Sequence, residues 1–254
     1  MQNLFWVDFN FVIFAVVFKL MKKLYIFVVF VLCAFLGNAQ IYEIGVFSGG
    51  TNFIGDVGST TFISPNKIAI GGLIKWNRSP RHSYRASLIY TTLHADDRTS
   101  SDPKREQRGY FFNAKGLEFS AGIEFTFLDF DLHKRSYNFS PYIYTGISIL
   151  NHPNFYYNNN TLYSAKTRSN TLGIPIALGA KFTLTEHLIL GAEIAAHYSF
   201  SDEIDGSIPE NKTEEFESLR FGNINNNDWY VFSGFTLTYT FGRNPCFCTY
   251  QKWI

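Results

Sequence analysis

Eight ionisable side chains fall on the polar faces of segments whose side chains alternate in character. They are Glu43, Lys75, Arg85, Glu118, Glu124, Lys181, Glu193 and His197. Carboxylates near a histidine could carry out acid–base chemistry or line an ion path. The alternative is a network of mutually neutralised charges in a narrow, poorly hydrated interior, where an unpaired charge is costly. Since four carboxylates face three permanent cations, the balance favours the paired network.

A lipid-modifying enzyme is the second class of function to consider. Such an enzyme needs a nucleophile within reach of a histidine. His197 and Ser199 lie on one face of their segment, but this is the polar face shared with the charges above. The sequence contains no Gly-x-Ser-x-Gly motif and no metal-ligand spacing. We therefore expect a non-enzymatic protein without a cofactor.

The segments that carry these residues have a period of two, which is typical of β-strands. In the last of them one face is apolar and aromatic-rich, whereas the other is small and polar. The apolar face holds Val231, Ser233, Phe235, Leu237, Tyr239 and Phe241, and the other holds Gly234, Thr236, Thr238 and Thr240. One face suits lipid and the other a polar lumen, so the pattern predicts a transmembrane β-barrel.

Eight such segments can be counted, each long enough to cross a bilayer when tilted. They cover about 40–50, 66–77, 82–93, 111–128, 140–150, 171–184 and 187–200, and the last ends at Phe241. The segment 140–150 is apolar on both faces, so its orientation stays open. The fold class predicted is all-β: an eight-stranded antiparallel transmembrane up-and-down barrel, similar to OmpA and OmpX.

The connections support the same fold because their lengths alternate. Residues 78–81 and 184–187 form short turns, whereas about 17, 20 and 27 polar residues join the other strand pairs. Short turns belong on the periplasmic side and long loops outside, which places both ends of the barrel in the periplasm. The acidic connection 201–227 is expected to be a solvated loop, with a calcium site as the alternative. The connection 129–139 is the exception, being long for a periplasmic turn.

The first 39 residues predict export to the envelope. Met21-Lys22-Lys23, an apolar run to Leu36 and Gly37-Asn38-Ala39 have the order of a signal peptide over 21–39. Residues 1–20 are interpreted as the product of a wrongly assigned upstream start codon, with Met21 as the true initiator. The alternative is a membrane helix within 1–36. The barrel would then occupy 40–241, followed by a periplasmic tail at 242–254. Without the leader 19 basic and 20 acidic residues remain, which gives no reason to expect nucleic-acid binding.

The connection 129–139 and the tail 242–254 both lie on the predicted periplasmic side, and their length suggests a docking surface for a partner. The candidate docking residues are His133, Lys134, Arg135, Cys246, Cys248 and Trp253. Two thiolates make only half a zinc site, and a Cys-x-Cys spacing is poor for a disulfide. The alternative for the tail is a frayed end.

Two stretches resemble a known family. Residues 43–58 read EIGVFSGGTNFIGDVG, and their GG-x-N-aromatic-x-GD phrase at 49–56 is similar to the opening strand of PorG-type proteins. Lys75-Trp76-Asn77, Ser79-Pro80-Arg81 and Arg85 resemble the second-to-third strand hairpin of the same proteins. Outside these stretches the likeness is the eight-strand pattern of 40–241.

The resemblance implies an outer-membrane barrel of the type IX secretion system of Bacteroidetes. Its partners would be outer-membrane lipids and a periplasmic ring of PorK/GldK-type and PorN/GldN-type proteins. The implied role is to anchor that ring, with protein secretion and gliding motility depending on it. No catalytic residues are implied. The rival functions are a stand-alone OmpA/OmpX-like barrel for envelope integrity or surface binding and, third, a lipid-modifying enzyme.

Overall fold

The computed structural model describes residues 41–132, 138–207, 209, 218–223 and 226–242. The proposed leader, the tail beyond Gly242 and all six candidate docking residues therefore lie outside the described residues. Within the described residues, no helix is long and apolar enough to span a membrane.

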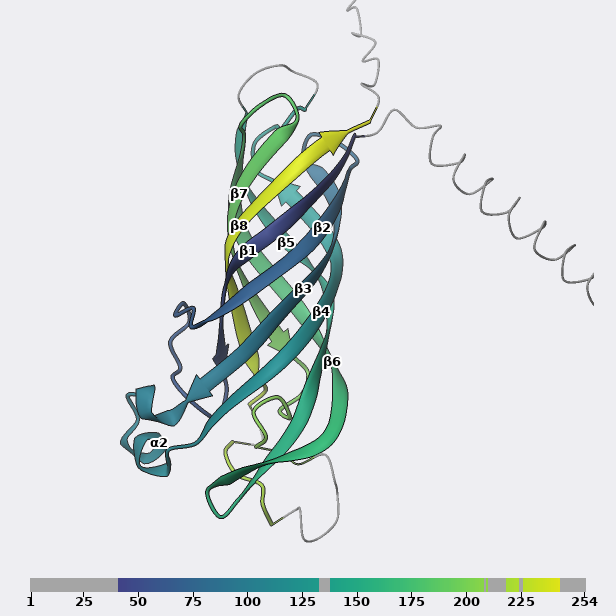
Figure 1. Cartoon of the computed structure of the whole chain (residues 1–254). Helices are drawn as coiled ribbons and strands as arrows, with labels where there is room; N and C mark the ends of the chain where they lie inside the picture. Colours follow the sequence, from purple (N-terminus) through teal and green to yellow (C-terminus); the bar gives the residue numbers. More distant parts are fainter. Residues whose placement is uncertain (1–40, 133–137, 208, 210–217, 224–225, 243–254) are drawn as a thin grey trace, which may run out of the picture. The chain divides into compact units, whose positions relative to one another are not determined.

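The described residues form the predicted closed barrel of eight antiparallel strands in sequence order (Figure 1). The strands are β1 (Ile41–Ile54), β2 (Lys67–Asn77), β3 (His82–Asp96), β4 (Phe111–Thr126), β5 (Phe139–Asn158), β6 (Thr161–Thr183), β7 (Leu188–Ser199) and β8 (Trp229–Phe241). Pairing of β1 with β8, from Tyr42 opposite Phe241 to Ile54 opposite Trp229, closes the ring. Closure leaves no unpaired strand edge, which is what a spanning sheet requires in lipid.

The exterior of the barrel is an apolar band. Along β4 and the residue that follows it, the outward side chains from Leu117 to Phe127 are apolar. At about 3.3 Å per residue and a strand tilt of about 40°, this run spans about 25 Å along the barrel axis. That height matches the hydrocarbon layer of a bilayer. The orientation of β5, left open by its sequence, is settled by its tyrosines. Tyr142 and Tyr144 face the interior, where their hydroxyls meet Glu193 and Ser120.

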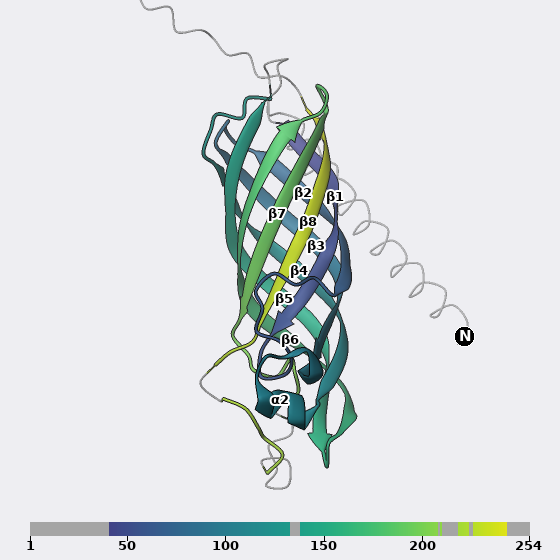
Figure 2. The same cartoon turned by 90° about the vertical axis from the view of Figure 1, so that its left-hand side faces the viewer.

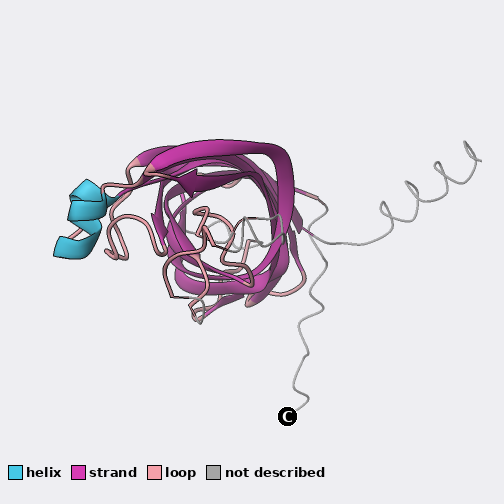
Figure 3. Cartoon of the chain, turned by 90° about the horizontal axis from the view of Figure 1, so that it is seen from below, coloured by secondary structure: helices cyan, strands magenta, loops and turns pink. Residues whose placement is uncertain are grey.

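The two ends of the barrel differ. We call "turn end" the end with the connections 78–81 and 184–187, and "loop end" the opposite one. Figures 1 and 2 show the hairpin of β5 and β6 and the helix α2 (Pro103–Arg108) together at the loop end. Viewed from that end, loops lie across the ring of strands (Figure 3).

Two long connections at the loop end differ from the expectation of plain loops. The predicted loop after residue 150 is a continued ladder of β5 and β6, irregular between Pro153 and Phe155, which turns at Asn159 and Asn160 with positive φ values of 49° and 62°. Asparagine tolerates this conformation better than most residues, which permits the tight turn. The connection after β3 contains the short 3-10 helix η1 (Asp97–Thr99) and α2.

Phe130, in the described part of the long connection at the turn end, packs against the lumen. The backbone N–H of Phe130 donates to the Pro80 carbonyl oxygen over 3.0 Å, and the Phe130 ring is buried beneath the Lys181 ammonium, 4.7 Å from its nitrogen. Part of the extra length of 129–139 therefore places an aromatic ring against the lumen at this end of the barrel.

Candidate functional site

The structure places all eight predicted ionisable side chains in the barrel interior, each at most 4% exposed. Nearest the turn end, Glu124 of β4 accepts from two lysines on opposite sides. Its Oε2 lies 2.6 Å from the Lys75 ammonium on β2, and its Oε1 lies 2.7 Å from the Lys181 ammonium on β6. One carboxylate thus joins three walls of the lumen.

The next pair spans the lumen. Arg85 of β3 and Glu193 of β7 form two parallel hydrogen bonds, Nη1 to Oε2 over 2.6 Å and Nη2 to Oε1 over 2.7 Å. The Tyr142 hydroxyl donates to the same Oε2 over 2.6 Å, and the Arg85 guanidinium lies 4.8 Å from the Tyr144 ring centre. A two-bonded arginine–carboxylate contact of this kind is strong and directional.

Glu118 and His197 lie further towards the loop end. The Tyr230 hydroxyl donates to Glu118 Oε2 over 2.5 Å, and His197 Nδ1 is 3.0 Å from the same oxygen. The His197 ring stacks on Tyr230, with centroids 4.8 Å apart. These contacts hold the histidine against two walls of the interior.

Glu43 is held at the seam where the barrel closes. It accepts from the Asn77 amide of β2 through Oε1 and from the Thr238 hydroxyl of β8 through Oε2, both over 2.8 Å. Its carboxylate is therefore satisfied by neutral donors from both neighbours of β1. The eight residues do not form one cluster: seven lie in three separate paired groups along the lumen, and Glu43 is held by neutral donors.

The geometry offers no lipid-facing arrangement for His197 and Ser199, since both side chains are buried inside the barrel. A serine–histidine contact does occur in the turn 78–81, where Ser79 Oγ is 3.2 Å from His82 Nδ1. That hydroxyl also accepts from the backbone N–H groups of Arg81 and His82, as in an ordinary serine-stabilised turn.

An aromatic layer lies between the charges and the loop end. Phe53, Phe112 and Phe155 pack with ring centroids 5.1 and 5.2 Å apart, and Phe232 packs on His197. Tyr110 and Tyr157 stack in parallel 4.1 Å apart. This layer separates the charged lumen from the loops above it.

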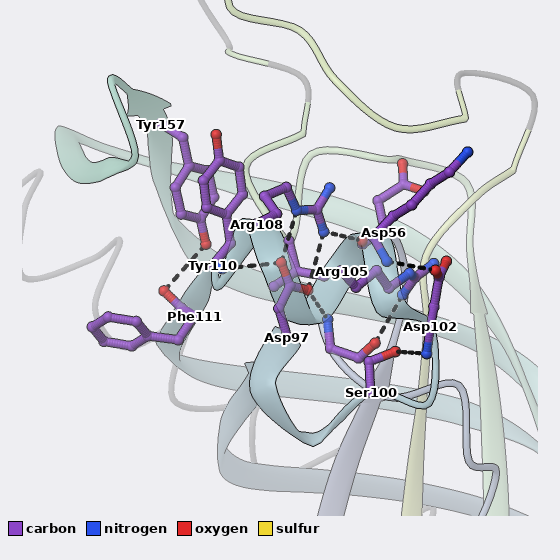
Figure 4. Close-up of polar contacts among 12 residues, drawn as sticks. Asp56, Asp97, Ser100, Asp102, Arg105, Arg108, Tyr110, Phe111 and Tyr157 are labelled. Carbon is purple, nitrogen blue, oxygen red and sulfur yellow. Dashed lines mark hydrogen bonds and ion pairs between the residues drawn. The ribbon is translucent and has the colours of Figure 1, made fainter.

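The loops are joined by a second polar network, which we call the loop cap: residues 55–58, 97–110 and 201–207. Arg108 of α2 binds Asp97 through Nε (2.7 Å) and Nη2 (3.0 Å), and its Nη2 also donates to the Asp56 carbonyl oxygen over 2.7 Å (Figure 4). Asp97 further accepts from the backbone N–H groups of Gly58 and Tyr110. One arginine thus ties α2 to the chain leaving β1.

Asp205 extends the loop cap to the segment after β7. Its Oδ2 accepts from the backbone N–H groups of Asp56 (2.8 Å) and Val57 (3.2 Å), and its Oδ1 accepts from that of Ser207. Since Asp202, Ile204 and Asp205 are buried, the expectation of a solvated acidic loop is wrong for this part of 201–227. Asp97 accepts four hydrogen bonds from N–H and guanidinium groups, and Asp205 accepts three from backbone N–H groups. These hydrogen bonds explain why the two carboxylates can be buried.

Acidic groups in the loop cap, and Asp228, which accepts from the backbone N–H of Ile204 in it, are destabilised in their charged form. Burial, together with the nearby Asp205 and Asp56, raises the pKa of Asp202 to about 8. Burial also raises the pKa of Asp205 and, with the charges of Asp205 and Asp202 adding to it, that of Asp228. No group of three or more potential metal ligands occurs among the described residues, so the calcium alternative has no support there.

The sequence reasoning missed the loop cap. Asp56 belongs to the GG-x-N-aromatic-x-GD phrase, which was a usable signal, because two of its members, Gly55 and Asp56, make cap contacts. A third member, Asn52, binds the carbonyl oxygens of Thr61 and Phe62, outside the cap. No comparable signal marks Asp97, Arg108 or Asp205.

Comparisons with solved structures find small barrels from several bacteria. The N-terminal β-barrel domain of Pseudomonas aeruginosa OprF is 13% identical, with a TM-score of 0.43, over 80% of this chain and 98% of that one. Ail of Yersinia pestis, solved with the heparin analogue sucrose octasulfate, is 10% identical, with a TM-score of 0.44, over 80% and 100%. OprG of Pseudomonas aeruginosa is 11% identical, with a TM-score of 0.44, over 80% and 97%.

No curated protein matches the chain. A family model described as "Domain of unknown function (DUF6089)" matches residues 22–250, which include the whole barrel. The chain belongs to the DUF6089 family.

Proposed function

We propose that this protein is a non-enzymatic, non-conducting barrel of the outer membrane that anchors a periplasmic ring of the type IX secretion machinery. The observation that carries the structural role is the filled lumen. Side chains from opposite walls meet in it, as Arg85 of β3 does with Glu193 of β7. A barrel whose interior charges are used on one another serves as a membrane anchor rather than as a channel.

The apolar band supports insertion in a membrane, and closed barrels with short turns at one end are the form that outer-membrane proteins take. In the proposed orientation the turn end faces the periplasm. An epitope inserted between Asn159 and Asn160 should then be accessible on intact cells, and one in the turn 184–187 should become accessible only after the outer membrane is permeabilised. The reverse pattern would overturn the orientation.

The assignment to the secretion machinery is supported by the two stretches that resemble PorG-type proteins. The first stretch begins as β1 and ends in the loop cap, and the second forms the β2–β3 hairpin at the turn end. The phrase thus coincides with residues whose contacts are specific, rather than with the repetitive alternation that any barrel shares. In this respect the resemblance goes beyond the general barrel pattern.

The decisive experiment separates the two ends of the molecule. In cells lacking the gene, a variant with His133, Lys134 and Arg135 changed to glutamate should insert and remain heat-modifiable in gels. It should not restore cargo secretion, and the periplasmic ring proteins should no longer co-purify with it.

The matched control is Arg108→Gln, which loosens the loop cap and leaves the turn end unchanged; it should restore secretion fully. If instead the loop-cap variant loses function and the turn-end variant does not, the anchoring role is wrong. The organised loop cap would then favour the second candidate, a surface-binding barrel whose partner contacts the loops.

A further inference from the structure

The outward face of three neighbouring strands changes character at one level of the barrel. The apolar band ends with Leu117 of β4, Ile149 of β5 and Leu172 of β6, all well exposed at 43%, 40% and 57%. Register places these residues close together, because Leu117 pairs with Asn151 and Ile149 pairs with Leu172. Their common level marks the edge of the hydrocarbon layer on this side of the molecule.

The next outward residues towards the loop end are polar and cationic. We call them the rim patch: Lys115, Asn151, Arg168 and Asn170. Arg168 Nε donates to Asn151 Oδ1 over 2.6 Å, and its Nη2 donates to the carbonyl oxygens of Asn151 (3.1 Å) and Lys115 (3.2 Å). The guanidinium therefore reaches back across β5 to the strand that carries Lys115.

The rim patch has unbalanced charge. All acceptors for Arg168 are neutral, and within the described part of the chain neither Lys115 nor Arg168 forms an ion pair. Nη1 of Arg168 donates to no described residue, although the other nitrogens fix the plane of the guanidinium. The Arg168 guanidinium is thus fixed against the backbone of Lys115, whose own side chain is exposed, and one arginine nitrogen and the lysine ammonium are left for a ligand.

We propose that the rim patch binds the phosphate of a phosphorylated lipid, whose acyl chains lie on Leu117, Ile149 and Leu172. A fixed guanidinium suits phosphate, and a surface lysine adds a further charge. A soluble anion would have no reason to bind at the edge of an apolar band, whereas a lipid presents its phosphate at this depth. In the proposed orientation the loop end faces outwards, so this lipid would lie in the outer leaflet; the leaflet rests on the proposed function, but the binding itself does not.

The test uses the full-length mature protein purified in detergent. Binding of diphosphoryl lipid A is titrated by native mass spectrometry, alongside the same lipid after enzymatic dephosphorylation and inorganic phosphate. Lys115→Gln/Arg168→Gln should weaken lipid A binding at least about tenfold, equivalent to 1.4 kcal/mol. Lys115→Arg should retain it, and wild-type protein should bind the dephosphorylated lipid as weakly as the double variant binds lipid A.

The matched control is Lys67→Gln/Lys104→Gln, which removes two exposed positive charges elsewhere at the loop end and should leave binding unchanged. Heat-modifiable migration in gels verifies that each variant is folded. Equal binding by the double variant and wild type would overturn the proposal. So would inorganic phosphate binding as tightly as the lipid, since the patch would then be a site for soluble anions. Because the assay is independent of cellular orientation and secretion, its failure leaves the proposed function untouched.

Discussion

At the scale of single residues, the pair of Arg85 and Glu193 in the lumen predicts that a single substitution destabilises the barrel more than the double substitution. Glu193→Gln should lower the free energy of unfolding by about 3–5 kcal/mol, because it leaves the Arg85 guanidinium buried without its carboxylate. Arg85→Gln/Glu193→Gln should be less destabilised than this single variant, since no charge is then stranded. Urea unfolding in lipid vesicles, followed by heat-modifiable migration, measures all three.

The exposed Glu106 of α2 provides the control, because Glu106→Gln removes a carboxylate that is not buried. It should change the free energy of unfolding by less than about 0.5 kcal/mol. A double variant at Arg85 and Glu193 that is no more stable than the worse single one would contradict the paired lumen.

A second residue-scale prediction concerns pH. The folded loop cap raises the pKa of Asp202 from 3.8 to about 8, so the closed cap binds its proton more tightly than the open form. The free energy that favours the closed cap should therefore decrease as the pH rises from about 4 to 8. Above pH 8, deprotonation of Asp202 should cause no further decrease. Hydrogen-exchange protection factors at Ile204 and Ser207 should fall between pH 5 and pH 8.5.

Asp202→Asn should reduce that fall, because the amide does not titrate in this range. Some dependence on pH should remain, since Asp205 and Asp228 also have raised pKa values. If the protection factors of wild type and Asp202→Asn change equally with pH, Asp202 does not control the closure.

At the scale of elements, α2 is held to the chain leaving β1 by two arginines, since Arg105 donates to the carbonyl oxygens of Gly55 and Gly58 and Arg108 makes the larger set of contacts. Arg108→Gln removes the contacts to Asp97 and to the Asp56 carbonyl oxygen, together with the stacking of the guanidinium on Tyr110. Limited proteolysis on intact cells should then cleave the segment 97–110 at least several-fold faster, while the barrel stays heat-modifiable.

Arg98→Gln is the matched control, because the Arg98 side chain that pairs with Asp96 is largely exposed and surface pairs contribute little. It should leave the cleavage rate close to that of wild type. Equal acceleration by both substitutions would show that Arg108 has no special part in holding α2.

The elements also show what the sequence could and could not predict. The period of two in β4 and β6 follows from which face meets lipid, so the inward placement of Glu118 and Lys181 was predictable from local pattern. Which carboxylate each cation meets was not, because the pairing depends on the stagger of strands around the ring. The loop cap was missed for the same kind of reason: Asp205 binds the backbone of Asp56, 149 residues away.

At the scale of the whole molecule, the lumen itself should be the barrier to ions. In planar bilayers the purified protein should show no open-channel steps, because side chains from opposite walls meet in the interior. Arg108→Gln, which loosens only the loop cap, should be equally silent. Steady channel activity in wild-type protein would contradict the filled interior, and activity only in the cap variant would move the barrier to the loops.

The closing seam has a consequence for how the barrel is assembled. Glu43 is satisfied by Asn77 of β2, the next strand, and by Thr238 of β8, the last strand, and Arg85 meets Glu193 across 108 residues. Thr238 and Glu193 are absent from the first hairpins, so an unfinished barrel must keep water around Glu43 and Arg85. Water around Glu43 should therefore leave the lumen only when β8 pairs with β1 and brings Thr238 to this carboxylate. We expect a chain stalled before its last strand to keep Glu43 hydrated, and hence to be less stable in a membrane than the closed barrel.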